Sequence, residues 1–343
     1  MVYQKRIIDN IEKCYALAKM KWNGEQVLMV AGEKKAPCRI YSKEGKILSQ
    51  VWDSPGGVMT MVAVPNNDGV FLATQEFFSP DESENAKLVC ARYSEEGWKI
   101  NKIADLPWVH RFDIIPVNNR NYVIACTLKS GHEYPGDFRK PGKIYAGVLS
   151  EDPSEPLELS VIKEGLTRNH GYTRFEKEGI IHAVISCDEG VYLVTLPQED
   201  ESWKFEQLLD TAASDCFMID LDNDGLEELL TISPFHGDKI CIWHMSENGK
   251  YEQVYKHSEN MPFLHAIIGG NIKGTPMIFV GNREGKRQLL GFYYDKVNRE
   301  YKYDIIDENT GVANALLYYE EGDPHLLTSN REIDEVAIYD IIV

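Results

Sequence analysis

Residues 214–258, SDCFMIDLDNDGLEELLTISPFHGDKICIWHMSENGKYEQVYKHS, decide the fold of this chain. They contain four short runs that are apolar or that alternate apolar with polar residues: CFMIDL, LEELLTI, KICIWHM and YEQVYK. Turn-forming Asn, Asp and Gly residues separate the runs, so each run predicts a β-strand. Four strands in about 45 residues make one antiparallel sheet, the size of a single propeller blade. One such sheet cannot bury both faces, so neighbouring sheets must cover them.

The same four-run pattern recurs on both sides of this segment. Five further units of similar length follow it or precede it, at residues 14–52, 57–106, 109–162, 171–209 and 264–306. In the third unit the fourth strand is expected at residues 157–162, and a long insertion at residues 129–141 separates the second and third strands. The recurrence predicts an all-β fold, a β-propeller.

The last unit, from residue 312 onward, has only three runs, and the N-terminus offers the missing strand. Residues 2–9, VYQKRIID, resemble the outer run of the preceding unit, residues 300–307, EYKYDIID. Pairing of the N-terminal strand with residues 336–341 would close the last blade and remove an exposed sheet edge. We therefore expect seven blades in one domain spanning residues 1–343.

Composition limits the classes of partner. The net charge of −18 argues against nucleic acid and anionic membranes, which need a basic surface. No apolar run is long enough to span a membrane, and the first residues lack the pattern of a signal peptide. Seven cysteines, without a paired spacing, indicate reduced thiols. We expect a cytoplasmic protein whose partner is a small molecule; the oligomeric state stays open.

The loop between the first two strands of the opening segment has the pattern DxDxDG. Its oxygen donors have the spacing that wraps Ca²⁺ or Mg²⁺, with a backbone carbonyl at the seventh position. These are Asp220, Asp222, Asp224, Leu226 and Glu228. The loop resembles the metal loops of FG-GAP/VCBS-type propeller repeats. The other interpretation is a turn rich in Asp and Asn that needs no ion. A single site of this kind predicts a structural rather than a catalytic metal.

Histidines recur at the starts of the innermost strands. Counting back from each second strand places His110, His170 and His265 at one rim, together with Cys14 and Cys216. Imidazole is a general base near neutral pH and a ligand of Zn²⁺-like ions, so we expect the three histidines to serve in catalysis and a Zn²⁺-like ion to be possible there. The cysteines are interpreted as small buried residues, and the histidines can alternatively join neighbouring blades.

Loops on the same face add charged residues. The insertion at residues 129–141 is long for a compact domain, which is typical of functional loops. We expect Lys129 to act in catalysis, and six further residues to contact substrate: Arg111, His132, Arg139, His236, Arg283 and Arg331. Positive side chains that point into one funnel can bind a carboxylate or an enolate. Alternatively they form a solvated charged rim whose counter-charges are Glu284 and Glu332.

One family resemblance follows from these residues. The run His110-Arg111, then Cys126-Thr-Leu-Lys129, Gly136-Asp-Phe138 and Pro141-Gly-Lys-Ile-Tyr145, is similar to the propeller of fungal aldos-2-ulose dehydratases, also called 1,5-anhydrofructose dehydratases. The resemblance implies a seven-bladed propeller with a bound divalent ion, and removal of water from a keto-sugar with a histidine as base.

Two functions remain open at this point. The first is a carbon–oxygen lyase that acts on a keto-sugar or related carbohydrate, with its site in the funnel. The second is a non-catalytic propeller that binds a glycan or a protein, for which exposed aromatic residues such as Phe77, Phe78 and Phe235 are the expected contacts.

Overall fold

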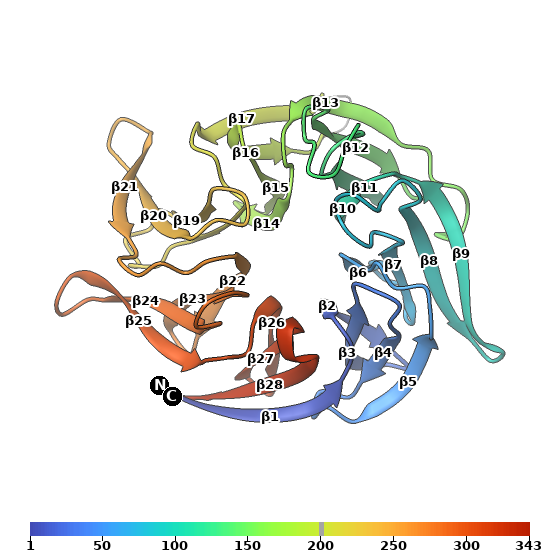
Figure 1. Ribbon diagram of the computed structural model, residues 1–343, viewed down its shortest axis with the longest axis horizontal. Coiled ribbons are helices and arrows are strands. Elements are labelled where there is room, and N and C mark those ends of the chain that lie inside the picture. The colour runs from blue at the N-terminus through green and yellow to red at the C-terminus, as the bar shows by residue number, and fades with distance from the viewer. Residues whose placement is uncertain (199–201) are drawn as a thin grey trace. The chain divides into compact units, whose positions relative to one another are not determined.

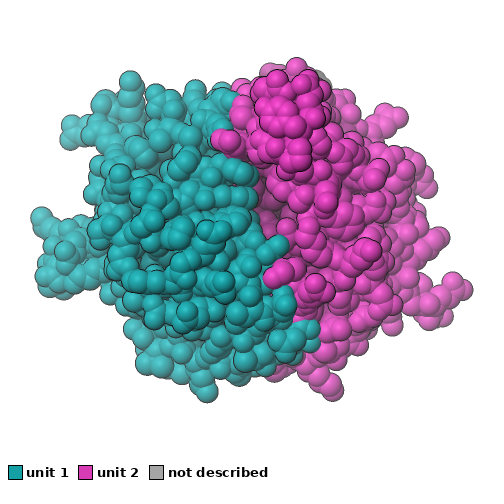
Figure 2. All heavy atoms as spheres, in the orientation of Figure 1, with its two compact units in different colours: residues 1–10, 171–194, 205–343 teal, residues 11–170, 195–204 magenta. Residues whose placement is uncertain are grey.

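The computed structural model describes residues 1–198 and 202–343, and these residues form two compact units. Unit 1 comprises residues 1–10, 171–194 and 205–343, and unit 2 comprises residues 11–170 and 195–204; Figure 2 colours them separately. The described residues form seven four-stranded antiparallel sheets and a single short 3₁₀ helix, as the sequence pattern predicts for an all-β fold of seven blades. None of the described helices is long and apolar enough to cross a membrane.

Unit 2 contains three of the sheets, and the strands in each follow chain order (Figure 1). The strands are β2 (Cys14–Trp22), β3 (Glu25–Gly32), β4 (Cys38–Tyr41) and β5 (Ile47–Trp52); β6 (Met61–Ala63), β7 (Val70–Gln75), β8 (Lys87–Ser94) and β9 (Gly97–Asp105); and β10 (Val109–Val117), β11 (Arg120–Thr127), β12 (Gly142–Val148) and β13 (Ser160–Leu166).

Unit 1 contains the other four sheets. The strands are β14 (Gly171–Lys177), β15 (Ile180–Cys187), β16 (Gly190–Thr195) and β17 (Lys204–Leu209), whose junction residues 195 and 204 are assigned to unit 2; β18 (Asp215–Ile219), β19 (Glu228–Ser233), β20 (Lys239–Met245) and β21 (Tyr251–Lys256); β22 (Leu264–Ile272), β23 (Thr275–Asn282), β24 (Leu289–Asp295) and β25 (Glu300–Asp307); and β26 (Val312–Glu320), β27 (Asp323–Asn330), β28 (Glu335–Ile342) and β1 (Val2–Asn10). The 3₁₀ helix η1 (Arg331–Ile333) joins β27 to β28.

The last sheet has the predicted N-terminal strand. β1 pairs antiparallel with β28 from Val2 opposite Ile342 to Asn10 opposite Glu335, with one irregularity between Ile7 and Asp9. The Arg6 guanidinium donates to both carboxylate oxygens of Asp340 on β28, at 2.7 and 3.0 Å. The prediction that the N-terminus completes the final blade is therefore confirmed.

One strand is displaced from its expected place. The sequence pattern predicts a strand at residues 157–162, whereas β13 begins only at Ser160. The Leu157 N–H donates instead to the Ile103 carbonyl of β9 at 2.8 Å, so this residue lies outside β13 and contacts the neighbouring sheet. Hydrophobic alternation alone does not show which sheet a residue joins.

Apolar faces of consecutive sheets pack against one another within unit 1. Leu230 and Ile242 of the β18–β21 sheet form one buried cluster with Ile278 and Phe292 of the β22–β25 sheet. Each of these four side chains is fully buried. This packing holds the loops at the strand ends in fixed positions, which is what a site built from several sheets requires.

Candidate functional site

The first strands of several sheets carry a β-bulge at their second residue. The ladder register shifts between Val109 and Arg111, between Leu264 and Ala266, and between Val312 and Asn314, so His110, His265 and Ala313 are the bulged residues. A bulge leaves one residue out of the ladder and re-aims its side chain. Tyr15 is bulged in the same way on β2, and it is therefore the equivalent of His110, one residue after the predicted Cys14.

In unit 1, the imidazole of His265 is held by the next sheet. It is only 2% exposed, and its Nδ1 lies 2.6 Å from the Ala313 carbonyl oxygen. A carbonyl oxygen only accepts, so Nδ1 carries the proton in this hydrogen bond and Nε2 carries the lone pair in the neutral ring. The bulge on β26 frees that carbonyl from the ladder. His265 is thus fixed as the tautomer that a general base or a metal ligand requires.

His236 lies beside His265 in the same unit. It occupies the β19–β20 connection with a positive φ of 46°, and its ring stacks on Phe235 at 4.0 Å between centroids. Its centroid is 5.3 Å from that of His265 and 4.5 Å from that of Phe263. Each histidine offers a ring nitrogen within 4.8 Å of the other. Of the residues predicted from sequence, these two come together in unit 1.

Two predicted arginines of unit 1 share one carboxylate. The Arg283 guanidinium donates from Nε to Glu332 Oε1 at 2.8 Å, and Arg331 Nη1 donates to the same oxygen at 2.8 Å. Burial raises the pKa of Glu332, but the charges and hydrogen bonds of the two arginines outweigh it and hold that pKa below its usual range. Arg283 also lies over the Phe263 ring, 4.3 Å from its centroid. Two guanidinium groups around one carboxylate leave this contact cluster positively charged.

In unit 2, His110 and His170 stack on each other. Their centroids are 4.3 Å apart with 34° between the planes, and they are 3% and 1% exposed. The Tyr15 hydroxyl lies 3.4 Å from His110 Nε2, and Arg111 Nη1 donates to the Met59 carbonyl at 3.0 Å.

Lys129 of unit 2 anchors the long β11–β12 connection. Its side chain is fully buried, and Nζ donates to Asp81 Oδ1 at 2.7 Å. The Gly136 N–H donates to the other oxygen of Asp81 at 2.9 Å. Partial burial raises the pKa of Asp81, but these two hydrogen bonds and the lysine charge lower it overall. Lys129, which was expected to act in catalysis, therefore holds the loop against the β7–β8 connection.

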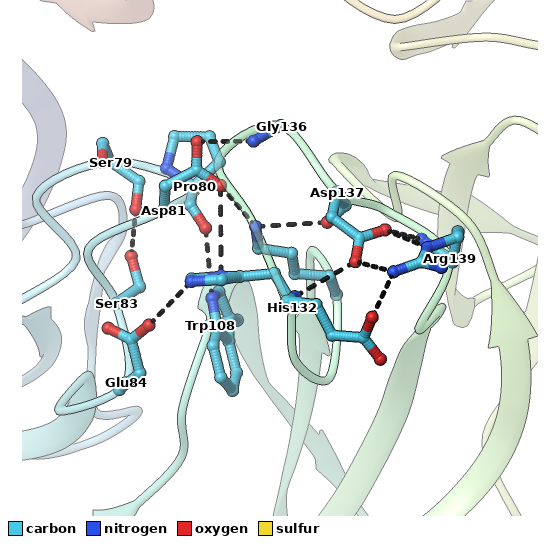
Figure 3. A network of polar contacts seen from close by, with 12 residues as sticks. Ser79, Pro80, Asp81, Ser83, Glu84, Trp108, His132, Gly136, Asp137 and Arg139 are labelled. Carbon is cyan, nitrogen blue, oxygen red and sulfur yellow. Dashed lines mark hydrogen bonds and ion pairs between the residues drawn. The ribbon is translucent and has the colours of Figure 1, made fainter.

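Arg139 and Asp137 of this loop form an ion pair (Figure 3). Arg139 donates to Asp137 at 2.8 Å and to Glu133 at 2.8 Å, and these hydrogen bonds hold the pKa of Asp137 well below its usual range. His132 Nε2 lies 3.4 Å from Glu84. Of the side chains predicted to contact substrate in unit 2, His132 and Arg139 therefore have acidic partners within the protein.

The DxDxDG loop joins β18 to β19 in unit 1. Asp220 accepts from the Asp224 and Gly225 N–H groups at 3.1 and 3.0 Å, and Asp222 accepts from Asp224 at 3.0 Å. One carboxylate oxygen of each of these three Asp residues lies within 4.8 Å of the others. The three carboxylates thus lie close together, and each oxygen bound to an N–H retains a second lone pair. The Ca²⁺ or Mg²⁺ site at this loop stays a prediction.

Glu228, the last residue of the predicted set, is fully buried at the start of β19. It accepts from the Leu221 N–H at 2.6 Å and from the Tyr301 hydroxyl at 2.9 Å. Burial raises the pKa of Glu228 to about 7, and the charge of Asp222 adds to the shift. Among the described residues its single ion-pair partner is His244, whose Nε2 is 4.0 Å from Oε1.

Sequence reasoning missed His244, Tyr301 and Asp81. His244 lies on β20, one position beyond the Leu229–Trp243 pair of the ladder, which places it beside Glu228. The pairing register of β19 with β20 is the feature that identifies His244 as a neighbour of Glu228. Tyr301 and Asp81 come from neighbouring sheets, and no local pattern marks them.

Comparisons with known proteins add information about the fold. No protein-family model matches the chain, and no curated protein matches its sequence. Among solved structures, the β-propeller domain of Cps50 (Swd1) from Myceliophteria thermophila is similar with a TM-score of 0.66 and 8% identity, covering 99% of this chain and 100% of that one. The periplasmic gluconolactonase PpgL of Pseudomonas aeruginosa has a TM-score of 0.60 and 11% identity, covering 96% and 92%.

A third similar structure is a streptogramin B lyase, with a TM-score of 0.61, 12% identity and coverage of 99% and 98% of the two chains. Identities this low carry information on fold alone. They agree with the seven four-stranded sheets in the described part of the chain. The chain is a seven-bladed β-propeller.

Proposed function

We propose that the chain is a carbon–oxygen lyase that removes water from a keto-sugar or related carbohydrate, with His265 as the base. The observation that carries this proposal is the 2.6 Å contact between His265 Nδ1 and the Ala313 carbonyl. That hydrogen bond leaves Nε2 as the basic nitrogen of a buried ring, and imidazole is the side chain that most often serves as a general base in proton abstraction.

The elimination balances with the groups of unit 1. Nε2 of His265 takes the proton on the carbon next to the ketone, and the electrons of the broken C–H bond form an enolate. The enolate collapses to a carbon–carbon double bond as the hydroxyl on the next carbon leaves. His236, within 4.8 Å of His265, supplies the proton that turns this hydroxyl into water. The product is an enone; the proton on His265 returns to solvent, and His236 takes up a proton from solvent to restore the starting state.

The arginines of unit 1 supply positive charge for the enolate. Arg283 and Arg331 converge on Glu332, and the Phe263 ring contacts both the Arg283 guanidinium and the His236 imidazole. The Phe263 ring therefore lies between the histidine pair and the arginine pair. The two pairs are close enough together for one small substrate to contact both. A fixed positive group next to a developing oxyanion lowers the barrier without reorganisation.

Two further lines support an enzyme. Solved propellers of similar fold include proteins named as a gluconolactonase and as a streptogramin B lyase. The His110-Arg111 run and the DxDxDG loop resemble the aldos-2-ulose dehydratase propeller. In this proposal the stacked pair His110 and His170 is the second candidate for the base, and Lys129, paired with Asp81, positions the long loop.

The test combines turnover with proton exchange. Purified protein is incubated with a panel of keto-sugars, and enone formation is followed by its ultraviolet absorbance. In D₂O, nuclear magnetic resonance reports exchange at the carbon next to the ketone, which detects the base even where elimination is slow. His265→Ala should lower kcat by about 10²–10⁴-fold. His182→Ala, a half-buried histidine of β15 in the same unit, is the matched control.

Three outcomes separate the candidates. Loss of turnover and of proton exchange in His265→Ala, with both unchanged in His110→Ala, supports the proposal. Loss only in His110→Ala moves the base to unit 2. Binding of sugars without exchange or turnover identifies the alternative, a non-catalytic glycan-binding propeller. The paired charges of Lys129 and Arg139 favour that alternative, because ion-paired groups form a rim more readily than a reacting site.

A further inference from the structure

A second group of possible metal ligands lies next to the predicted loop site and includes a nitrogen. Asp222, Glu228 and His244 each offer one ligand atom, and these atoms lie within 4.8 Å of one another. They come from the β18–β19 loop, the first residue of β19 and strand β20 of one sheet. His244 and Glu228 are cross-strand neighbours by the ladder register, so the sheet itself holds two of the three in place.

Within the described residues, His244 is the one basic side chain that pairs with the acids of this cluster. Glu228 is fully buried, yet Asp222 is close by and no lysine or arginine among the described residues forms an ion pair with either carboxylate. Buried carboxylates are normally paired with a cation or bind a metal. The remaining contacts of Glu228 are the Leu221 N–H and the Tyr301 hydroxyl, which are neutral donors. The cluster therefore suits a cation.

The donor types indicate which cation. Ca²⁺ and Mg²⁺ take oxygen ligands, whereas imidazole suits Zn²⁺ and other later transition-series ions, and Mn²⁺ accepts it beside carboxylates. His244 Nε2 lies 3.0 Å from Asp224 Oδ2, so this ring nitrogen already points at the acidic loop. A loop that binds only hard cations has no need for an imidazole at this position.

The cluster is accessible from solvent. Asp222, Asp224 and His244 line a cavity of about 570 Å³ that is also bounded by Tyr294, Arg299 and Tyr301. An ion held by the cluster can enter through this cavity, and an entry path is a requirement for any such site. The residues that line this cavity all belong to unit 1, and they do not include His236 or His265 of the proposed lyase site.

We propose that Asp222, Glu228 and His244 hold a divalent transition metal of the Mn²⁺ or Zn²⁺ type, in place of the Ca²⁺ or Mg²⁺ predicted from the loop sequence. The proposal does not depend on the lyase activity. In this proposal His244 is a metal ligand. Asp220 is not a ligand, because it belongs only to the group of carboxylates Asp220, Asp222 and Asp224.

The decisive measurement is electron spin echo spectroscopy of Mn²⁺ added to metal-free full-length protein. A coordinated imidazole nitrogen gives a ¹⁴N modulation, and this signal is expected in the unmodified protein. Because it needs no substitution, the result stands even if a variant folds poorly. Mn²⁺ that binds without ¹⁴N modulation overturns the proposal, and so does failure of both Mn²⁺ and Zn²⁺ to bind.

Calorimetric titration of variants gives a second, independent readout. His244→Ala should weaken Mn²⁺ and Zn²⁺ binding at least about tenfold, with His182→Ala unchanged as the matched histidine control. Asp220→Asn should leave Mn²⁺ affinity within about threefold of the unmodified protein, well below the loss expected for a ligand. The reverse pattern, with loss in Asp220→Asn and none in His244→Ala, identifies the loop as a hard-cation site and overturns the proposal.

Discussion

Two glutamates of unit 1, the half-buried Glu332 and the fully buried Glu228, have opposite surroundings. Glu332 accepts from Arg283 and Arg331, and their charges hold its pKa below the usual range. Glu228 is more deeply buried and has Asp222 as a neighbour, and burial raises its pKa to about 7. In the first region the protein supplies the counter-charge; in the second it supplies further acids and an imidazole.

The difference separates a self-contained ion cluster from one that is completed by an external ion. A buried carboxylate that is paired stabilises its partners, whereas an uncompensated one shifts toward its protonated form. The Glu332 region should therefore be sensitive to loss of charge, and the Glu228 region should gain stability either from neutralisation or from a bound cation.

Breaking the compensated cluster has the largest expected effect. Glu332→Gln leaves two largely buried guanidinium groups without their shared carboxylate, at 8% and 9% exposure. The free energy of unfolding should fall by about 3–5 kcal/mol, the usual cost of removing one partner from a buried pair. Urea denaturation measures the loss. Glu284→Gln, an exposed change in the neighbouring loop, should stay within about 0.5 kcal/mol. Equal effects for the two substitutions would contradict the assignment of Glu332 as the counter-charge.

Glu228→Gln should act in the opposite direction. A raised carboxyl pKa means that the folded protein binds the proton more tightly than the unfolded chain does. The stabilisation is complete below the unfolded pKa, near 4.3, and is lost as pH rises through about 7. In chelator at pH 8, Glu228→Gln should therefore be more stable than the unmodified protein by about 2–3 kcal/mol, and the two should converge near pH 4.

Added metal sharpens the same test. Mn²⁺ should raise the melting temperature of the unmodified protein and leave that of Glu228→Gln unchanged, because a bound ion stabilises only the form that binds it. A Glu228→Gln variant that is less stable than the unmodified protein in chelator at pH 8 would show that the carboxylate is already compensated.

The smallest expected effect comes from Tyr301→Phe. Its hydroxyl donates to Glu228 at 2.9 Å from the neighbouring sheet, and burial raises the pKa of Tyr301 well above its usual range. Loss of this bond should lower the free energy of unfolding by about 1 kcal/mol and move the pH dependence of stability further upward. Tyr294→Phe, a hydroxyl on the same cavity, is the control. If the pH dependence of stability is unchanged in Tyr301→Phe, the hydrogen bond from Tyr301 does not influence the pKa of Glu228.

Much of the fold was predictable because strands and turns leave local marks in the sequence. Alternating runs between Gly, Asn and Asp residues predicted the strands, and the likeness of residues 2–9 to residues 300–307 predicted the pairing of β1 with β28. The displaced strand β13 shows the limit of prediction from local patterns. Leu157 donates its hydrogen bond to Ile103, which is far away in sequence, so no local pattern predicts this contact.

The candidate sites were predictable only in part. Spacing within one loop indicated Asp220, Asp222, Asp224 and Glu228, since those ligands lie on consecutive turns. It did not indicate His244, which becomes a neighbour of Glu228 through the ladder register. The partners of Lys129 and Arg283 come from other sheets or connections, so the sequence showed the charges but not their pairing.

The pairing of β1 with β28 also has a consequence for synthesis and folding. Arg6 and Asp340 are in contact although 334 residues separate them, so their sheet contains some of the most non-local contacts in the chain. During translation, β1 leaves the ribosome before the other described strands and cannot pair with β28 until residues 335–342 have followed. Contacts of such high order form slowly. Residues 1–10 are thus an unpaired strand for most of synthesis, when chaperones or another nascent copy of the chain can capture them.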